Sequence, residues 1–216
     1  MPTPTTLPTP DAVVEAVVDA LLQLHPLSSI ALTGGRVGTR ITTELISRWP
    51  TERPLRVWFS DERFLPIGDD ERNDSAAVDA LQERADNLIE IESALGPDSA
   101  RTVADSATDY AERIDRLGLA DAAVVSIGPD GHVASLFPGH SVLADTRSTV
   151  VAITDSPKPP ASRITWTLPL LLACPTVILV AVGADKRDAI ARVLDGDGNL
   201  PATKLAMAGA RLYVCV

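Results

Sequence analysis

Short apolar runs of strand length alternate along the chain with segments whose apolar residues recur at helical spacing. The runs predict strands at residues 29–33, 55–60, 87–91, 122–127, 150–154, 177–182 and 212–216. The segments between them predict helices at about residues 11–24, 39–48, 75–84, 104–117, 168–172 and 185–194. Such alternation is typical of parallel sheets, because each crossover between parallel strands takes a helix-sized connection. The pattern predicts an α/β fold: a three-layer α/β/α sandwich around a mostly parallel, doubly wound, Rossmann-like sheet.

The first ten residues differ in composition from the rest. Residues 1–10 are rich in Pro and Thr and lack an apolar stretch, so we expect a flexible N-terminal tail there rather than a signal peptide. Thr9 followed by Pro10 is a typical helix start, with Thr as the N-cap and Pro in the first turn. Residues 11–216 contain no repeat and no low-complexity linker, so we expect one domain. No apolar run reaches membrane-spanning length.

The net charge narrows the class of partner. The 216 residues include 29 Asp and Glu against 19 Lys and Arg, a formal charge of −10, which disfavours nucleic acid and membranes as partners. An anionic small molecule would need a local cluster of cations, and only three of the 19 cations are lysines. Cys174 and Cys215 are far apart and lack metal-ligand spacing, so we expect reduced thiols in a cytoplasmic protein. The assembly stays open between a monomer and a small homo-oligomer.

The most informative feature is a histidine just beyond the apolar run at 122–127. Two glycines and a proline in residues 128–131 force a sharp turn where the predicted strand ends. His132 is therefore expected at the rim of the sheet, where open α/β sheets bind their ligands. The alternative is a polar residue that only caps or satisfies the turn. Asp130 either orients the imidazole or merely stabilises the turn.

Polar residues also follow other predicted strands. The loops carry Gly34-Gly35-Arg36, Asp61-Glu62-Arg63, Asp130-Gly131-His132 and Asp185-Lys186. A fifth loop, after the strand at 150–154, carries Lys158 and Arg163. Because the carboxyl ends of parallel strands share one edge of the sheet, the topology should bring these loops together.

Each loop has a structural and a functional interpretation. The pair Gly34-Gly35 is either a tight turn or an anion-binding turn that leads into a helix N-terminus. Lys186, in the first turn of a predicted helix, either reaches into solvent or contacts a phosphate. The Asp61-Glu62-Arg63 triplet is either a solvated loop or holds a paired Arg against ligand oxygens. Asn73 either faces the crevice or caps the following helix.

Together these segments resemble the 6-phosphogluconolactonase family, within the glucosamine-6-phosphate isomerase/6-phosphogluconolactonase superfamily. The resemblance extends from Ala31 to about Ala202, and its most specific segment is residues 128–138. Supporting segments are residues 60–66, Asn73, residues 157–160, residues 163–165 and residues 183–186. The family fold is similar to that of glucosamine-6-phosphate deaminase and ribose-5-phosphate isomerase.

The resemblance implies an activity and a site. The activity is hydrolysis of 6-phospho-D-glucono-1,5-lactone to 6-phospho-D-gluconate in the oxidative pentose phosphate pathway, with no metal and no organic cofactor. The matching histidine is the family's proposed base, and the matching Arg63, Arg163 and Lys186 bind substrate, the last two its phosphate. The expected site comprises His132, Arg63 and Asp130 as catalytic residues and Gly34, Gly35, Arg36, Asp61, Asn73, Gly131, Arg163 and Lys186 as binding residues.

One segment departs from the family pattern. The family commonly carries a Gly-Gly-Ser-Thr-Pro type of loop after the first strand, whereas residues 34–39 read Gly-Gly-Arg-Val-Gly-Thr. The side-chain hydroxyl contacts expected there are missing. Backbone N–H groups, with Arg36, are the groups left to hold a phosphate.

The hypothesis for mechanism is direct attack by water, with His132 as general base and Asp130 or nearby backbone fixing its tautomer. Arg63 either stabilises the oxyanion or positions the lactone hydroxyls. No Gly-x-Ser-x-Gly motif is present, so Ser135 is not expected to be a nucleophile. Two rivals remain. One is a phosphosugar isomerase or deaminase in which Asp61 serves as a carboxylate base, and the other is a non-catalytic phosphosugar sensor.

Overall fold

A seven-stranded sheet forms the centre of the protein in a computed structural model that describes residues 3–25, 27–84 and 88–216. Its strands run in the spatial order β1-β10-β9-β6-β2-β3-β5, and every neighbouring pair is parallel. Their bounds are β1 (Thr5–Thr6), β2 (Ser29–Leu32), β3 (Leu55–Phe59), β5 (Ile89–Glu92), β6 (Ala122–Ser126), β9 (Thr176–Val182) and β10 (Arg211–Cys215). The predicted parallel, doubly wound sheet is confirmed.

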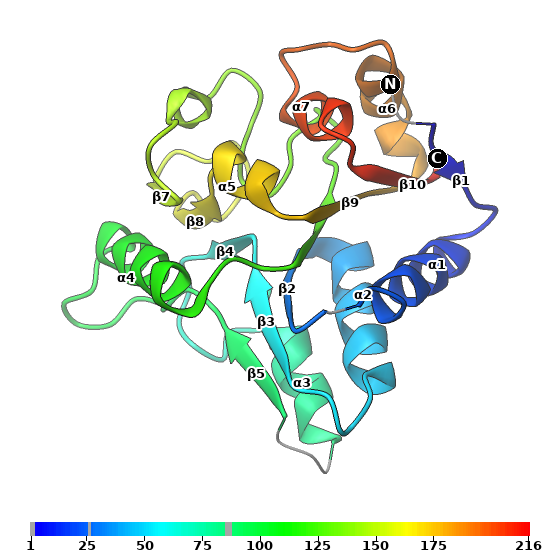
Figure 1. Cartoon of the computed structure of the whole chain (residues 1–216). Helices are drawn as coiled ribbons and strands as arrows, with labels where there is room; N and C mark the ends of the chain where they lie inside the picture. The colour runs from blue at the N-terminus through cyan, green and yellow to red at the C-terminus, as the bar shows by residue number, and fades with distance from the viewer. Residues whose placement is uncertain (1–2, 26, 85–87) are drawn as a thin grey trace.

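Helices cover both faces of this sheet (Figure 1). One layer consists of α1 (Pro10–Leu22), α2 (Gly35–Arg48) and α3 (Ser75–Gln82). The other contains α4 (Val103–Leu117), α5 (Leu168–Ala173), α6 (Arg187–Leu194) and α7 (Pro201–Met207). Side chains alternate along each strand, so Ile30 and Leu32 pack in the first layer while Ala31 packs in the second. The three-layer prediction therefore holds.

A second, antiparallel sheet lies within the layer of α4. It has the order β4-β8-β7, with β4 (Asp61–Arg63), β7 (Val150–Ile153) and β8 (Arg163–Trp166). This corrects two predictions. Asp61-Glu62-Arg63 is a strand rather than a loop, because β4 pairs with β8 and brings Arg63 opposite Arg163. The strand at 150–153 belongs to this sheet rather than to the parallel one, because its only strand partner among the described residues is the antiparallel β8.

The N-terminal residues are also placed differently from the prediction. Thr5 and Thr6 pair in parallel with Tyr213 and Val214 of β10, and the Leu7 N–H donates to the Val214 carbonyl at 2.9 Å. A free tail is therefore wrong for residues 5–10. The helix start at Thr9 is confirmed, since the Thr9 side chain accepts a hydrogen bond from the Ala12 N–H.

Several other elements differ from their predicted bounds. α2 begins at Gly35 rather than near Thr39, which places Arg36 in its first turn. The helix predicted at 185–194 divides into a 3₁₀ turn, η2 (Ala184–Lys186), followed by α6. The elements α7 and η1 (Ser141–Ala144) were not predicted. Asn87, predicted to begin a strand, lies outside the described residues.

The strand order creates a crevice between β2 and β6. From β2 the chain proceeds outward through β3 to β5, whereas β6, β9 and β10 lie on its other side. The loops after β2 and β6 therefore diverge, which leaves room for a ligand at the carboxyl ends of the strands.

No helix in the described part of the chain is long and apolar enough to cross a membrane.

Candidate active site

A cavity of about 560 Å³ occupies this crevice. The loops after β2, β3, β6 and β9 and the loop between β7 and β8 all contribute to its wall. The prediction that these loops meet is therefore confirmed. Of the predicted site residues, the wall contains Gly34, Gly35, Arg36, Asp61, Arg63, Asn73, His132, Arg163 and Lys186. Asp130 and Gly131 do not line it, although Asp130 contacts the wall residues His132 and Lys158.

The loop after β6 is a closed turn. The Gly131 N–H donates to the Gly128 carbonyl at 3.0 Å, and the Gly128 N–H donates to the His132 carbonyl at 2.8 Å. Gly131 has a φ of +85°, a conformation that side chains other than hydrogen disfavour. The predicted tight turn is confirmed, and it fixes the backbone from which the imidazole of His132 projects.

The imidazole of His132 is clamped from two sides. A Cβ atom at Gly128 would lie 1.9 Å from the ring atoms Nδ1 and Cε1, so the ring rests directly against the glycine backbone. On another side the ring of Phe137 packs with its centroid 4.8 Å away. Packing of this kind restricts the imidazole to one orientation.

Asp130 sets the tautomer of His132. The Asp130 Oδ1 atom hydrogen-bonds to Nδ1 and also accepts from the His132 backbone N–H at 3.4 Å. Because an ionised carboxylate only accepts, the network assigns the ring proton to Nδ1 and leaves the lone pair on Nε2. No group among the described residues hydrogen-bonds to Nε2. The nitrogen that can take a proton is therefore free.

Electrostatics keep this imidazole neutral. Burial lowers the pKa of His132, the hydrogen bond and charge of Asp130 partly oppose that effect, and the Lys158 ammonium lowers the pKa further. Burial works against ionisation of Asp130, yet the His132 hydrogen bond and the His132 and Lys158 charges leave its pKa below its usual range. At neutral pH the pair is a neutral imidazole, protonated only at Nδ1, with an ionised carboxylate behind it.

The short strand β4 divides its three charged side chains between two environments. Strand residues alternate in direction, so Asp61 and Arg63 face the cavity while Glu62 faces the interior and is fully buried. The Asp61 carboxylate accepts from the Ser135 hydroxyl at 2.7 Å and from the Asn73 side-chain amide at 3.3 Å. A solvated loop is therefore wrong for this triplet.

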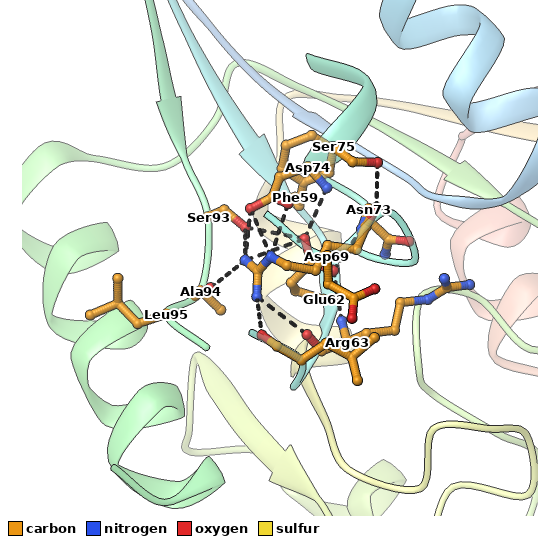
Figure 2. Close-up of polar contacts among 12 residues, drawn as sticks. Phe59, Glu62, Arg63, Asp69, Asn73, Asp74, Ser75, Ser93, Ala94 and Leu95 are labelled. Atoms are coloured by element: carbon orange, nitrogen blue, oxygen red, sulfur yellow. Dashed lines mark hydrogen bonds and ion pairs between the residues drawn. The ribbon is translucent and has the colours of Figure 1, made fainter. Parts of the chain in front are cut away.

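Glu62, buried beneath the cavity wall, connects β4 to the segment that precedes α3 (Figure 2). Its carboxylate accepts from the backbone N–H groups of Arg63 and Asn73, both at 2.7 Å, and of Asp74 at 3.0 Å. The buried Arg72 lies 3.8 Å from it and pairs with Asp74 at 2.7 Å. Burial and the Asp74 charge raise the pKa of Glu62 to about 7, although Arg72 and the N–H donors oppose them.

This arrangement places Arg63 and Asn73 on the cavity side. The side chain of Arg63 extends away from the Glu62 group in Figure 2, and its Nη1 donates to the Glu71 carbonyl. Its buried Nε has no hydrogen-bond partner among the described residues. Asn73 does not cap α3: the N-cap is Asp74, and the Asn73 amide instead donates to the Asp61 carbonyl at 2.8 Å.

The wall opposite β4 is formed by the loop after β2. A Cβ atom at Gly34 would come within 1.8 Å of the Asn73 Oδ1 atom, so only glycine allows this close approach. Gly35 has a φ of +76° and begins α2, with Arg36 beside it on the cavity wall. Lys186, from the loop after β9, lines the same cavity and lies 3.1 Å from the Asp185 carboxylate.

Three polar residues in or behind the cavity wall are not among the predicted site residues. Lys158 lines the cavity, and its Nζ lies 3.3 Å from the His132 Nδ1 and 3.8 Å from the Asp130 carboxylate. Arg40 reaches the wall from α2 and pairs with Asp11. Ser135 supports Asp61 from behind. The sequence places Lys158 in a loop at this edge of the sheet, and the scarcity of lysines draws attention to it, but the predicted site does not include it.

One further histidine and both cysteines lie outside the cavity. His140 caps η1 through the Val142 N–H and pairs with Asp155 at 2.9 Å, and it does not line the site. Both Cys174 and Cys215 are free thiols. Among the described residues, no group of three or more His, Cys, Asp or Glu side chains is arranged to hold a metal ion.

A crevice at the switch point of a doubly wound sheet, walled by cations and one partly buried imidazole, defines a class of α/β proteins that act on small anions. The sequence pattern of the glucosamine-6-phosphate isomerases and 6-phosphogluconolactonase matches residues 9–214. The chain belongs to this family.

Curated relatives agree with this assignment, and solved structures share the fold. A protein of Streptomyces coelicolor named 6-phosphogluconolactonase is 36% identical over 200 residues, which cover 85% of this chain and 76% of that protein. A 6-phosphogluconolactonase of Rattus norvegicus is 34% identical and covers 81% of this chain and 72% of its own. A Shewanella baltica 6-phosphogluconolactonase structure shares the fold with a TM-score of 0.84 at 20% identity, covering 100% and 98% of the two chains. A monomeric glucosamine-6-phosphate deaminase superposes with a TM-score of 0.80 at 19% identity, covering 99% and 97%.

Proposed function

We propose that this chain hydrolyses 6-phospho-D-glucono-1,5-lactone to 6-phospho-D-gluconate, the lactone step of the oxidative pentose phosphate pathway. The observation that carries the proposal is the free Nε2 of His132, which faces a cavity with a cationic wall. The relatives of known name support the same activity. The cavity is large enough for a hexose phosphate, and its charge suits one.

His132 is the proposed general base. An uncharged imidazole accepts a proton from water at Nε2 while Asp130 keeps the other ring proton in place. The water attacks the lactone carbonyl carbon, and the resulting imidazolium returns the proton to the ring oxygen as the C–O bond breaks. General-base help of this kind is typically worth about 10²–10⁴ in rate.

The remaining wall residues are proposed to bind the sugar phosphate. Lys186, Arg36 and the N–H groups at the start of α2 suit the phosphate, because they combine charge with unpaired backbone donors. Arg63 suits the lactone oxygens, since its buried Nε has no hydrogen-bond partner among the described residues. Binding the phosphate fixes the carbonyl near His132 and uses remote binding energy to orient the reacting atoms.

The test is a lactonase assay on freshly prepared 6-phosphogluconolactone, with spontaneous hydrolysis subtracted. The wild-type protein should accelerate hydrolysis, and His132→Ala should lower kcat by about 10²-fold or more while the fold is retained. His140→Ala is the matched control, because that histidine lies outside the cavity, and it should retain kcat. Equal kcat for His132→Ala and wild type would remove His132 from the mechanism.

The isomerase or deaminase alternative requires a carboxylate base at the sugar carbons. Asp61 is the candidate, but its carboxylate already accepts from Ser135 and Asn73. These contacts engage both carboxylate oxygens and orient Asp61 as part of the wall. Release of ammonia from glucosamine 6-phosphate, or formation of a ketose phosphate, at rates that exceed lactone turnover would favour the alternative.

A further inference from the structure

Arg163 was expected to bind phosphate, yet its donors are directed at the protein itself. Its Nε donates to the Pro160 carbonyl at 3.1 Å, and its Nη2 donates to the Pro159 and Lys158 carbonyls at 2.7 and 3.3 Å. Its Nη1 lies 3.4 Å from the Ser135 hydroxyl and 3.8 Å from the Asp61 carboxylate. A guanidinium has five N–H donors in a fixed fork, so three consecutive carbonyls occupy most of it. Arg163 is 7% exposed.

The loop that Arg163 holds carries Lys158 toward the base. The Lys158 ammonium lies 3.3 Å from the His132 Nδ1 and 3.8 Å from the Asp130 carboxylate. Because Nδ1 carries the proton that it donates to Asp130, it cannot accept a hydrogen bond from the ammonium. Its three N–H donors have no closer acceptor among the described residues. They are therefore available to a ligand in the cavity.

We propose that Lys158 is a second catalytic residue, whose ammonium group stabilises the negative charge that forms on the lactone carbonyl oxygen, and that Arg163 is its positioning residue. This inference rests on the proposed function. The Lys158 ammonium lines the same cavity as His132 and lies 3.3 Å from its imidazole ring, so a carbonyl bound beside the base comes within its reach. The phosphate is carried on C6, at the far end of the sugar from that carbon, where Lys186 and Arg36 serve it.

The role fits the electron flow of the reaction. As His132 removes a proton from water, the new C–O bond forms and the carbonyl π pair moves onto its oxygen. The alkoxide then accepts hydrogen bonds from Nζ. When the tetrahedral intermediate collapses, the pair returns to the carbonyl, the ring C–O bond breaks, and the ring oxygen takes the proton held on Nε2. The product acid releases its proton to solvent. A preorganised charged donor is the largest single contributor in many acyl transfers.

Lys158→Ala and Lys158→Gln test the first part. Each should lower kcat by about 10²-fold, the usual cost of one oxyanion donor, and change KM by less than about threefold. The kcat loss should be the same for 6-phosphogluconolactone and unphosphorylated gluconolactone, because the carbonyl is common to both. Added methylammonium should restore part of kcat in Lys158→Ala. Lys204→Ala, an exposed lysine of α7, is the control and should behave as wild type.

Two results would overturn this assignment. One is a kcat within about threefold of wild type in both Lys158 variants. The other is a rise in KM confined to the phosphorylated lactone, which would make Lys158 a phosphate ligand. A wild-type protein without lactonase activity would instead reject the proposed function, so the two failures are distinguishable.

Arg163→Lys tests the second part. A positioning residue acts through Lys158, so the double variant Lys158→Ala/Arg163→Lys should have the kcat of Lys158→Ala alone. Multiplied losses in the double variant would contradict this, as would a KM effect of Arg163→Lys on the phosphorylated lactone only. If Arg163→Lys does not fold, the Lys158 variants decide the catalytic claim, and Arg163→Gln, judged by the same double-variant comparison, decides the positioning claim.

Discussion

Gly128 carries no side chain at the point where the imidazole of His132 rests. A Cβ atom there would lie 1.9 Å from two ring atoms, well inside van der Waals contact. The sequence indicated that residues 128–131 turn sharply, but it did not indicate that the glycine also supports the ring. The requirement comes from a contact across the turn, which no residue pattern encodes directly.

We predict that Gly128→Ala displaces the imidazole and lowers kcat by about 10²-fold, because a shift of about 1 Å at a catalytic group has effects of this size. The measurement is kcat alongside the melting temperature. Gly198→Ala is the matched control, since nothing lies within 4 Å of a Cβ at that position and its φ is ordinary. Unchanged kcat in Gly128→Ala would show that the ring is not held there.

The pH dependence of kcat/KM should depend on the charged groups beside His132, because they shift its pKa. Burial lowers its pKa, so the acid limb of kcat/KM should have its midpoint below 6.5. Asp130→Asn removes a charge that raises the pKa and should move the limb to lower pH. Lys158→Gln removes a charge that lowers the pKa and should move it to higher pH. Shifts in the same direction for both variants would contradict the assignment.

At the scale of elements, β4 with the segment that leads to α3 acts as one unit. Glu62 binds three backbone N–H groups of this segment, and Arg72 ties it to the Ala94 carbonyl at 2.7 Å. Local propensity gives little sign of this unit, since Asp-Glu-Arg is a poor strand sequence. Pairing with β8 and burial of Glu62 override the propensity, which explains why the sequence predicted a loop here.

We predict that Arg72→Met lowers the free energy of unfolding by about 3–5 kcal/mol at pH 7, the usual cost of removing one partner of a buried ion pair. Both Arg72 and Glu62 are fully buried in this pair. Denaturant unfolding measures the change. Arg192→Met, which removes an exposed partner of Asp197, is the control and should have little effect.

The loss of stability in Arg72→Met should depend on pH, because Arg72 lowers the pKa of Glu62. With the pKa of Glu62 raised to about 7, the folded protein keeps a proton that the unfolded chain releases near its ordinary value of 4.5. The free energy of unfolding therefore decreases as the pH rises from 4.5 through 7. Arg72 opposes this rise in pKa, so the destabilisation by Arg72→Met should be larger at pH 8 than at pH 5. Equal losses at both pH values would separate Arg72 from the titration of Glu62.

How far the sequence predicts the elements depends on where their stability originates. The strands β2, β3, β6, β9 and β10 are largely apolar, and all but β10 are mostly buried on both faces, so the hydrophobic pattern predicts them within a residue or two. The short strands β1, β4 and β8 have two to four residues each and depend on distant partners. The exact position of Lys158 depends on one of them, because β8 and Arg163 determine where its loop goes.

At the scale of the whole molecule, the cavity wall is positively charged although the chain as a whole is negatively charged. The chain carries −10 overall, whereas the cavity wall has six cationic side chains against two carboxylates. The cations are Arg36, Arg40, Arg63, Lys158, Arg163 and Lys186, and the carboxylates are Asp61 and Asp185. The composition indicated that an anionic ligand would need such a cluster, and the shared edge of the parallel strands assembles it.

We predict that KM for the phosphorylated lactone rises as NaCl increases from 0.05 to 0.5 M, because the screening length shortens from roughly 14 Å to roughly 4 Å. KM for the unphosphorylated lactone should change less. Lys186→Ala should flatten the dependence for the phosphorylated substrate. Steady-state kinetics on both lactones measure these slopes, and parallel slopes for the two substrates would contradict a charge-based phosphate site.

The position of β10 between β1 and β9 has a consequence for how the chain folds as it is synthesised. Thr5 and Thr6 leave the ribosome about 200 residues before their partners Tyr213 and Val214. Contacts between such distant residues form slowly, because a long loop must close first. Until β10 arrives, β9 presents an unpaired edge to the cell. β10 covers that edge of β9 and pairs with β1 on its other side, so both pairings form only after β10 has been synthesised.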